Sequence, residues 1–330
     1  MSDIPPSTSA DEAAEVEQPV PVSEDAPDRT PLPDDPRMLK LLGNVKDALR
    51  ALPIYFRSAT NIEGLEAGDL FSLNSVLGGT IEVQTVATLN RVRDVWDPDD
   101  EWVEYSFERS SQSFPDVRLV SRNPSLPSPV LGIELKGWYV LSKELEPSAR
   151  FTATRDACSP WDLVVFVPWR LSNVLSGVPV VYEPFIEQAI YAADMRNHYW
   201  RVTRGAKGGD TGITPPKDVH PYPPAKTKTS DKANNDSGGN FGRLGRVPEL
   251  MSDYVTGVLM SPVAGIGARH WVSFFKTYLD NADETTVNET IERALARVSK
   301  PNEKARQEAM VRVLRELRPL LNGEPPEPTE

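Results

Sequence analysis

The chain has little sulfur or imidazole chemistry: one cysteine and three histidines in 330 residues. A single cysteine excludes an intramolecular disulfide framework, and we expect Cys158 to be a small buried residue rather than a nucleophile. The histidines, His198, His220 and His270, show no ligand spacing to one another or to the cysteine, so no zinc site is expected. These absences favour a cytoplasmic protein whose function depends on other side chains.

The chain also lacks an apolar run that approaches the length of a membrane span, and its first residues lack the apolar region of a signal peptide. We therefore expect a soluble, cytoplasmic protein with no membrane partner. The glycine-rich stretch at 238–246 lacks the Gly-Lys-Ser/Thr ending of a phosphate-binding loop, and no helicase or ATPase motif is present. A nucleotide-driven motor is not indicated.

The negative charge is concentrated at the two ends. Residues 1–36 hold ten acidic residues and one base, and residues 323–330 hold three acidic residues. Both segments have few large apolar side chains, so we expect disordered tails. The segment between them is neutral by count, although the chain as a whole carries −12. The acidic total therefore does not exclude a nucleic-acid partner.

Between the tails, apolar periodicity predicts regular elements. We expect an N-terminal helical segment over 37–77, with a helix at 37–56, and a central region over 78–204. The elements predicted in the central region are a helix at 78–96, strands at 101–111, 116–121, 129–142 and 161–169, and a helix at 183–204 that begins at Pro184. The sequence thus predicts an α/β (α+β mixed) fold with a central mixed sheet of four to five strands flanked by helices, followed by C-terminal helices.

The composition changes after residue 204. Residues 201–246 hold nine bases and four acids among many Gly, Pro and Asn, and we predict a flexible basic loop or insertion over 205–246. A mostly helical region is expected over 247–322. It contains two amphipathic stretches, 284–299 and 303–318, which suit either a dimer interface or a core.

The stretch SFPDVRLVSRNPSLPSPVLGIELKGW, residues 113–138, places charged side chains on a strand with an apolar context. Glu134 and Lys136 share one face of that strand, and their side chains are expected to lie roughly 6.5–7 Å apart, too far for a tight ion pair but with room for a metal, a water and a phosphate between them. Asp116 begins the preceding strand, and antiparallel pairing of the two strands would bring it level with Glu134. Two carboxylates and an ammonium group would then converge.

Such a group suits hydrolysis of a phosphodiester. Hard oxygen ligands hold Mg²⁺, which polarises a phosphate and acidifies a water molecule. A lysine beside them can orient that water or stabilise the developing charge. The alternative is an exposed edge strand with a surface Glu and Lys.

Pro115, Asp116, Glu134 and Lys136 resemble the signature of the PD-(D/E)xK nuclease superfamily. The resemblance covers roughly residues 78–204, and Glu134-Leu135-Lys136 is the only acid-x-Lys triplet in the chain. It implies a restriction-endonuclease-like core of helix, three antiparallel strands, helix and a further strand. The loop SARFTATRDACSP stands where the family often has the second helix, so the chain departs from the pattern there.

The resemblance implies specific roles. Asp116, Glu134 and the main-chain carbonyl of Leu135 would bind Mg²⁺, with Mn²⁺ able to substitute, and Lys136 would be the water-positioning base. Family members often have another acid on the first core helix; the candidates are Glu82, then Glu104 and Glu108. The implied protein is a magnesium-dependent DNA endonuclease, most similar to type II site-specific restriction enzymes. It would act on double-stranded DNA as a homodimer, and a restriction system can include a cognate methyltransferase.

Basic residues near the end of the central region and in the loop are candidate DNA contacts, because phosphate contacts dominate nucleic-acid affinity. They are Arg196, Arg201, Arg204, Lys207, Arg243 and Arg246. Plain surface explains Arg196 and Arg201 equally well, and a flexible basic loop is the alternative for the residues after them. Two other functions remain open: a repair or defence nuclease of the same superfamily that cuts by structure, and a non-catalytic DNA-binding protein on a nuclease-like core.

Overall fold

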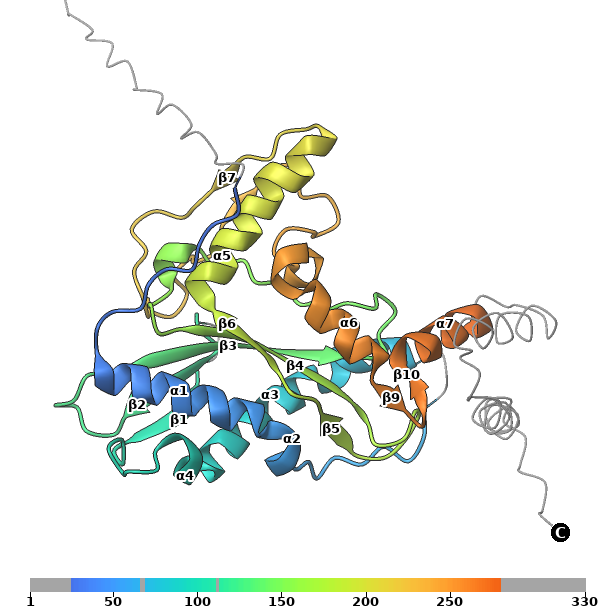
Figure 1. The fold of residues 1–330 in the computed structure, drawn as a ribbon, viewed down its shortest axis with the longest axis horizontal. Helices are drawn as coiled ribbons and strands as arrows, with labels where there is room; N and C mark the ends of the chain where they lie inside the picture. Colours follow the sequence, from blue (N-terminus) through green and yellow to red (C-terminus); the bar gives the residue numbers. More distant parts are fainter. Residues whose placement is uncertain (1–24, 66–68, 111–112, 280–330) are drawn as a thin grey trace, which may run out of the picture.

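A computed structural model describes residues 25–65, 69–110 and 113–279 of the chain, and a six-stranded mixed sheet forms its centre (Figure 1). The strands are β1 (Tyr105–Arg109), β2 (Val117–Ser121), β3 (Leu131–Tyr139), β4 (Leu163–Leu171), β5 (Pro179–Val181) and β6 (Phe185–Gln188). They follow the order β1-β2-β3-β4-β5, and β6 also pairs with β4. The prediction of a mixed sheet is confirmed, with six strands rather than four to five.

The pairing directions explain why the sheet is mixed. β1, β2 and β3 are successively antiparallel, whereas β4 runs parallel to β3. β4 then has two antiparallel partners, β6 along its first half and β5 along its last residues. The connection between the parallel strands contains a short 3-10 turn, Arg155–Ala157, and no α-helix. The helix that the resemblance implies at this place is therefore not present.

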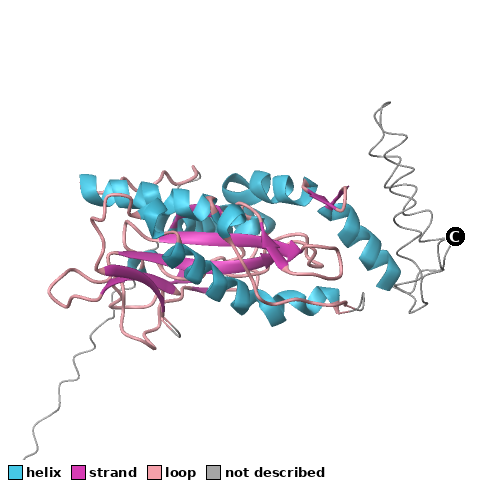
Figure 2. Cartoon of the chain, turned by 90° about the horizontal axis from the view of Figure 1, so that it is seen from below, coloured by secondary structure: helices cyan, strands magenta, loops and turns pink. Residues whose placement is uncertain are grey.

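Helices lie on both sides of the sheet (Figure 2). They are α1 (Pro36–Arg50), α2 (Leu52–Tyr55), α3 (Leu73–Arg91), α4 (Arg93–Trp96), α5 (Ala189–His198), α6 (Asp253–Met260) and α7 (Ala268–Leu279). In Figure 1, α5 and α6 lie above the central strands, and α1, α2 and α4 lie below them. Two small two-stranded sheets complete the fold: β7 (Ile213–Thr214) with β8 (Lys232–Ala233), and β9 (Pro262–Val263) with β10 (Ile266–Gly267). None of the helices in the described ranges is long and apolar enough to cross a bilayer.

The helix predicted at 37–56 is present as α1 and α2. Asp35 caps its start, because the Oδ1 atom accepts hydrogen bonds from the backbone N–H groups of Arg37 and Met38, each at 3.1 Å. Pro36 occupies the first helical position, where no N–H is required. The buried residues of α1 recur at helical spacing. They are Met38, Leu41, Leu42, Val45, Ala48 and Leu49.

The helix predicted at 78–96 begins earlier, at Leu73, and ends at Arg91. Gly78 and Gly79 lie inside α3 rather than before it. A Cβ atom on Gly137 would lie 3.5 Å from the Cα atom of Gly78, so the two glycines lie where α3 and β3 approach each other closely.

The prediction of one helix over 183–204 is wrong at its start. Residues Phe185–Gln188 form β6, and α5 begins only at Ala189; a π-helical turn, Tyr199–Arg204, follows it. β5 pairs only with the last residues of β4, which leaves the same edge of its first half open to another strand. β6 fills this edge: Phe185 pairs with Phe166, and Ile186 pairs with Val165. A long-range pairing therefore outweighs the local helix signal. The amphipathic stretches 284–299 and 303–318 lie outside the described residues.

The basic segment 205–246 is attached to the rest of the fold by backbone hydrogen bonds. The N–H of Phe151 donates to the Gly242 carbonyl at 2.8 Å, and the N–H of Thr154 donates to the Thr229 carbonyl at 2.7 Å. A buried ion pair between Arg196 of α5 and Asp231 adds a side-chain connection. The segment thus packs against residues 151–154 and α5.

Candidate active site

Asp116, Glu134 and Lys136 come together on one face of the sheet. Val117 pairs with Ile133 in the antiparallel register of β2 and β3, so Asp116 lies one step further, beside Glu134. The backbone N–H of Asp116 points at the Oε2 atom of Glu134, 3.3 Å away. The expected antiparallel pairing, and the level position of the two carboxylates, are confirmed.

The ammonium group of Lys136 bridges the two carboxylates. Its Nζ atom lies 2.8 Å from Oδ2 of Asp116 and 2.7 Å from Oε1 of Glu134. The expectation that Glu134 and Lys136 are too far apart for a tight ion pair is wrong. Cα atoms two residues apart along a strand are indeed separated, but the four-carbon stem of lysine bends back over that distance.

Burial controls the protonation of this group. Burial of Glu134 raises its pKa to about 7 from an ordinary 4.5, although the neighbouring Lys136 ammonium opposes the rise and the Asp116 carboxylate adds to it. For Lys136, burial alone would lower the pKa, but the carboxylates of Glu134 and Asp116 outweigh it and raise the pKa above its ordinary value. Lys136 is therefore a charged hydrogen-bond donor near neutral pH.

Glu82 reaches the same region from α3. Burial raises the pKa of Glu82, and the Asp116 carboxylate raises it further, while Lys136 and the N–H of Gly137 act in the opposite direction. Its Oε2 atom lies 3.7 Å from Nη2 of Arg109 on β1. Glu82 thus shares the electrostatic environment of the three strand residues.

Asp162, which sequence analysis did not select, supports the site from the start of β4. Its side chain is fully buried and accepts three hydrogen bonds of 2.7 Å, from the N–H groups of Gly132 and Ser159 and from the hydroxyl of Tyr222. Burial raises the pKa of Asp162 to about 6, against these donors. An acid directly before a run of apolar strand residues, in WDLVVFVPW, is the signal that could have found it.

Gly132 lets Pro115 and Asp162 approach β3 on the face that carries Glu134. A Cβ atom at this position would lie 2.4 Å from Cγ of Pro115 and 2.7 Å from Oδ1 of Asp162. Pro115 directly precedes Asp116. The glycine therefore sets the position of the segment that carries the first carboxylate.

The oxygen atoms at this place are of the kind that binds a hard divalent cation: the carboxylates of Asp116 and Glu134, and the carbonyl of Leu135, which lies between Glu134 and Lys136 in the chain. A cation would also stabilise the ionised form of Glu134, which burial disfavours. In residues 25–65, 69–110 and 113–279, no group of three or more His, Cys, Asp or Glu side chains could hold a metal ion. A cation here would be held by two carboxylates, with its other ligands from the main chain or water.

The basic residues selected from the sequence lie in four different environments. Arg196 is buried, and its guanidinium donates to the carbonyls of Phe151 and Ala153 at 3.0 and 2.9 Å and pairs with Asp231. In this structure it serves packing and is not accessible to DNA. The remaining five are nearer the surface: Arg201 and Lys207 are exposed, Arg204 lies over the ring of Trp200, and Arg243 and Arg246 pair with Glu146.

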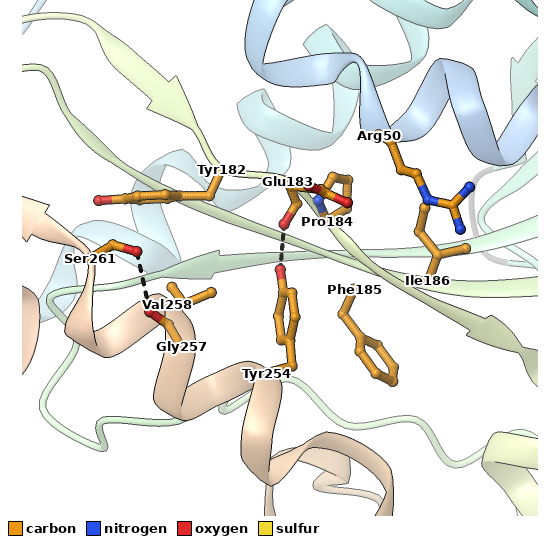
Figure 3. A pocket seen from close by; sticks show the side chains of 10 residues that line it. All are labelled: Arg50, Tyr182, Glu183, Pro184, Phe185, Ile186, Tyr254, Gly257, Val258 and Ser261. Atoms are coloured by element: carbon orange, nitrogen blue, oxygen red, sulfur yellow. Dashed lines mark hydrogen bonds between the residues drawn. The ribbon is translucent and has the colours of Figure 1, made fainter.

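A separate cavity of about 500 Å³ lies between α6 and the stretch that joins β5 to β6 (Figure 3). Tyr182, Phe185 and Tyr254 contribute rings to its lining, and Arg50 lines it from the end of α1. The hydroxyl of Tyr254 donates to the Glu183 carbonyl at 2.6 Å. The residues selected from the sequence do not line this cavity.

Comparison with known proteins adds no relative: no protein-family model, no curated protein and no solved structure matches the chain. The arrangement of Asp116, Glu134, Lys136 and Glu82 is therefore interpreted from its own geometry.

Proposed function

We propose that the chain is a magnesium-dependent deoxyribonuclease whose site consists of Asp116, Glu134, Lys136 and Glu82. The observation that carries the proposal is the bridging position of Lys136, 2.8 Å from Asp116 and 2.7 Å from Glu134 on one face of the sheet. An ammonium group buried between two carboxylates is unusual on a pair of strands. Hydrolysis of an anionic phosphodiester can use all three groups: the carboxylates to bind a cation, and the ammonium to stabilise negative charge.

The roles follow from charge and burial. Asp116, Glu134 and the Leu135 carbonyl would hold Mg²⁺, or Mn²⁺ in its place, and the bound ion would supply charge neutralisation on the phosphate and a more acidic water. Lys136 remains protonated, so it orients the attacking water and stabilises phosphate oxygens by donating hydrogen bonds. It is therefore better suited as a donor than as a base. Glu82, a carboxylate with a raised pKa, is the candidate proton acceptor.

The finer proposal is a restriction-endonuclease-like, type II site-specific enzyme that acts on double-stranded DNA. The mixed sheet with flanking helices is compatible with that reading. Cutting both strands of a palindrome would require a homodimer, and a cognate methyltransferase would protect the host DNA. A repair or defence nuclease with the same site would cut without sequence preference.

The test is digestion of unmethylated phage DNA with and without Mg²⁺, using the wild type and the Glu134→Gln and Lys136→Met proteins. Matched controls are Glu144→Gln and Lys143→Met, because both residues are exposed and follow β3 closely. Discrete, Mg²⁺-dependent fragments that only the first two variants lose would support the site-specific enzyme. Smeared products with the same dependence would support the repair or defence nuclease.

A non-catalytic DNA-binding protein is the second candidate. It is favoured by the position of the Lys136 ammonium group, which lies 2.8 Å from Asp116 and 2.7 Å from Glu134 and so already contacts the oxygen atoms that a metal ion would need. Intact DNA in Mg²⁺ and Mn²⁺, together with retained binding to a DNA duplex, would replace the nuclease proposal with this one.

A further inference from the structure

Arg118 lies next to the candidate active site on the same face of the sheet. It is two residues from Asp116 on β2, and it pairs with Gly132 while Asp116 lies beside Glu134. Side chains two apart on a strand share a face, so the guanidinium is one step along the sheet from the two carboxylates. Arg118 is not among the site residues predicted from the sequence.

The hydrogen bonds of Arg118 leave part of its guanidinium unused. The Nη2 atom donates to the carbonyl of Phe114 at 2.6 Å and approaches that of Pro223 at 3.5 Å, and the Nε atom is buried without a partner. Arg118 forms no ion pair with a carboxylate in the described ranges, whereas Arg109 pairs with Glu82 and Arg196 pairs with Asp231. The half-buried side chain thus keeps a positive charge without an anion bound to it.

Tyr222 and Asp162 fix the position of this guanidinium. The Cζ atom of Arg118 lies 5.8 Å from the centroid of the Tyr222 ring, and the Tyr222 hydroxyl donates to Asp162 at 2.7 Å. The carboxylate of Asp162 is already engaged by three donors, so it attracts Arg118 without pairing with it. Tyr222 has a φ of 54°, a left-handed conformation that places its ring here from the 205–246 segment.

A guanidinium without a carboxylate partner is well suited to an anionic oxygen, because its planar donors match phosphate geometry. We propose that Arg118 binds a backbone phosphate of the substrate, adjacent to the phosphate at Lys136, and that Tyr222 and Asp162 hold Arg118 in place for it. This inference rests on the proposed nuclease function. A DNA backbone carries a phosphate at every nucleotide, so a strand lying along β2 would present a second phosphate to Arg118.

The experiment measures binding of a DNA duplex, without divalent metal, over a range of salt concentrations. Each phosphate contact contributes about 0.9 to the slope of log K against log[salt], so Arg118→Gln should reduce that slope by about 0.9. Arg118→Lys keeps the charge and should keep the slope. Arg57→Gln is the matched control: Arg57 also donates to two backbone carbonyls, those of Ile54 and Phe56, and its slope should equal that of the wild type.

Tyr222→Phe supplies a second test that does not depend on the folding of Arg118→Gln. It removes only the hydroxyl bond to Asp162, and it should weaken duplex binding in the wild-type background but not in Arg118→Gln. An unchanged slope in a folded Arg118→Gln protein would overturn the inference, since Arg118 would then only connect Phe114 and Pro223. Unchanged binding by Tyr222→Phe would also count against it. A wild-type chain that binds no DNA would overturn the proposed function itself, so the two failures are distinguishable.

Discussion

Lys136 bridges Asp116 and Glu134, with nitrogen–oxygen distances of 2.8 and 2.7 Å. A single ammonium group therefore contacts two carboxylates, one on β3 and one on the residue directly before β2. The side chains of Glu134 and Lys136 are 12% and 19% exposed, so water screens this contact only partly. Changes at any of the three residues should affect both the stability of the fold and the proposed chemistry.

Replacement of Lys136 by methionine should destabilise the chain and abolish DNA cleavage. The variant leaves two carboxylates together in a mostly buried place, and removal of one partner from such a group costs up to about 3 kcal/mol when burial is incomplete. Urea unfolding measures this loss, and Lys143→Met, at an exposed position, should show none of it. An unchanged urea midpoint for Lys136→Met would contradict the role given to the bridge.

Glu134 should make the stability of the fold depend on pH. Because burial raises its pKa from 4.5 to about 7, the folded chain holds a proton between these values that the unfolded chain has lost. The contribution of protonated Glu134 to the free energy of unfolding is complete below pH 4.5 and is lost as the pH rises through about 7. Glu134→Gln cannot titrate, so its melting temperature should fall less than that of the wild type between about pH 5 and about pH 8. Parallel curves for the two proteins would disprove the raised pKa.

Mg²⁺ should stabilise the folded chain, and more so at higher pH. A metal binds the ionised carboxylate, so proton loss from Glu134 above its pKa favours binding. At a Mg²⁺ concentration about a hundred times Kd, the gain is about 2.7 kcal/mol. Thermal unfolding with and without Mg²⁺ at about pH 6 and about pH 8 measures the effect. Asp116→Asn and Glu134→Gln should lose it, while Glu144→Gln should retain it; an equal Mg²⁺ response in all four proteins would exclude a site at these carboxylates.

Replacement of Gly132 by alanine should destabilise the chain and disturb the position of Asp116. The new methyl group would lie 2.4 Å from Cγ of Pro115, a ring that cannot rotate away, so a cost of about 1–3 kcal/mol is expected. Gly43→Ala provides the contrast. Apart from the neighbouring backbone of α1 itself, no atom lies within 4 Å of the added methyl group, so this change should stabilise the helix by about 0.5–1 kcal/mol. Chemical unfolding of both variants decides, and a neutral Gly132→Ala would be the contrary result.

Arg196 should prove to be a structural residue. Burial lowers its pKa to about 10, yet it remains charged and pairs with Asp231 in the interior. Arg196→Gln leaves Asp231 buried without its cation and should cost about 3–5 kcal/mol, measured by chemical unfolding. Arg201→Gln, at an exposed position on the following turn, should change stability little. A stable Arg196→Gln protein with weakened DNA binding would instead support the original assignment of Arg196 as a DNA contact.

The sequence predicts the strand pair of the site well, because local signals determine it. Alternation places Glu134 and Lys136 on one face of β3, and the short proline-containing turn leaves β2 little choice but antiparallel pairing. Strand spacing does not predict the contact of Lys136 with Glu134, since it describes Cα atoms and not the ends of long side chains. Glu82 is a candidate only through the resemblance, which implies an acid on the helix before the strands.

Non-local relationships account for what the sequence did not show. Phe185–Gln188 has a helix-start proline before it, and only the free edge of β4 makes it a strand. Tyr222 lies 60 residues from Asp162 along the chain, and nothing in either local pattern connects them. Arg196 carries a full charge, so its sequence alone predicts an exposed side chain. It is buried because Asp231 pairs with it in the interior. In each case the partner lies far away in the sequence, where periodicity has no information.

β4 changes its antiparallel partner from β6 to β5 near Pro168. Tyr182 donates its N–H to the Pro168 carbonyl at 2.9 Å, but Pro168 has no N–H to return, so the ladder with β5 stops there with half of a residue pair unmade. The next three residues, Tyr182–Pro184, leave the edge of the strand, and they line the cavity of Figure 3 before pairing resumes at Phe185. Pro168 therefore marks the residue at which β4 changes its antiparallel partner, and the stretch that leaves the strand there forms one wall of the cavity.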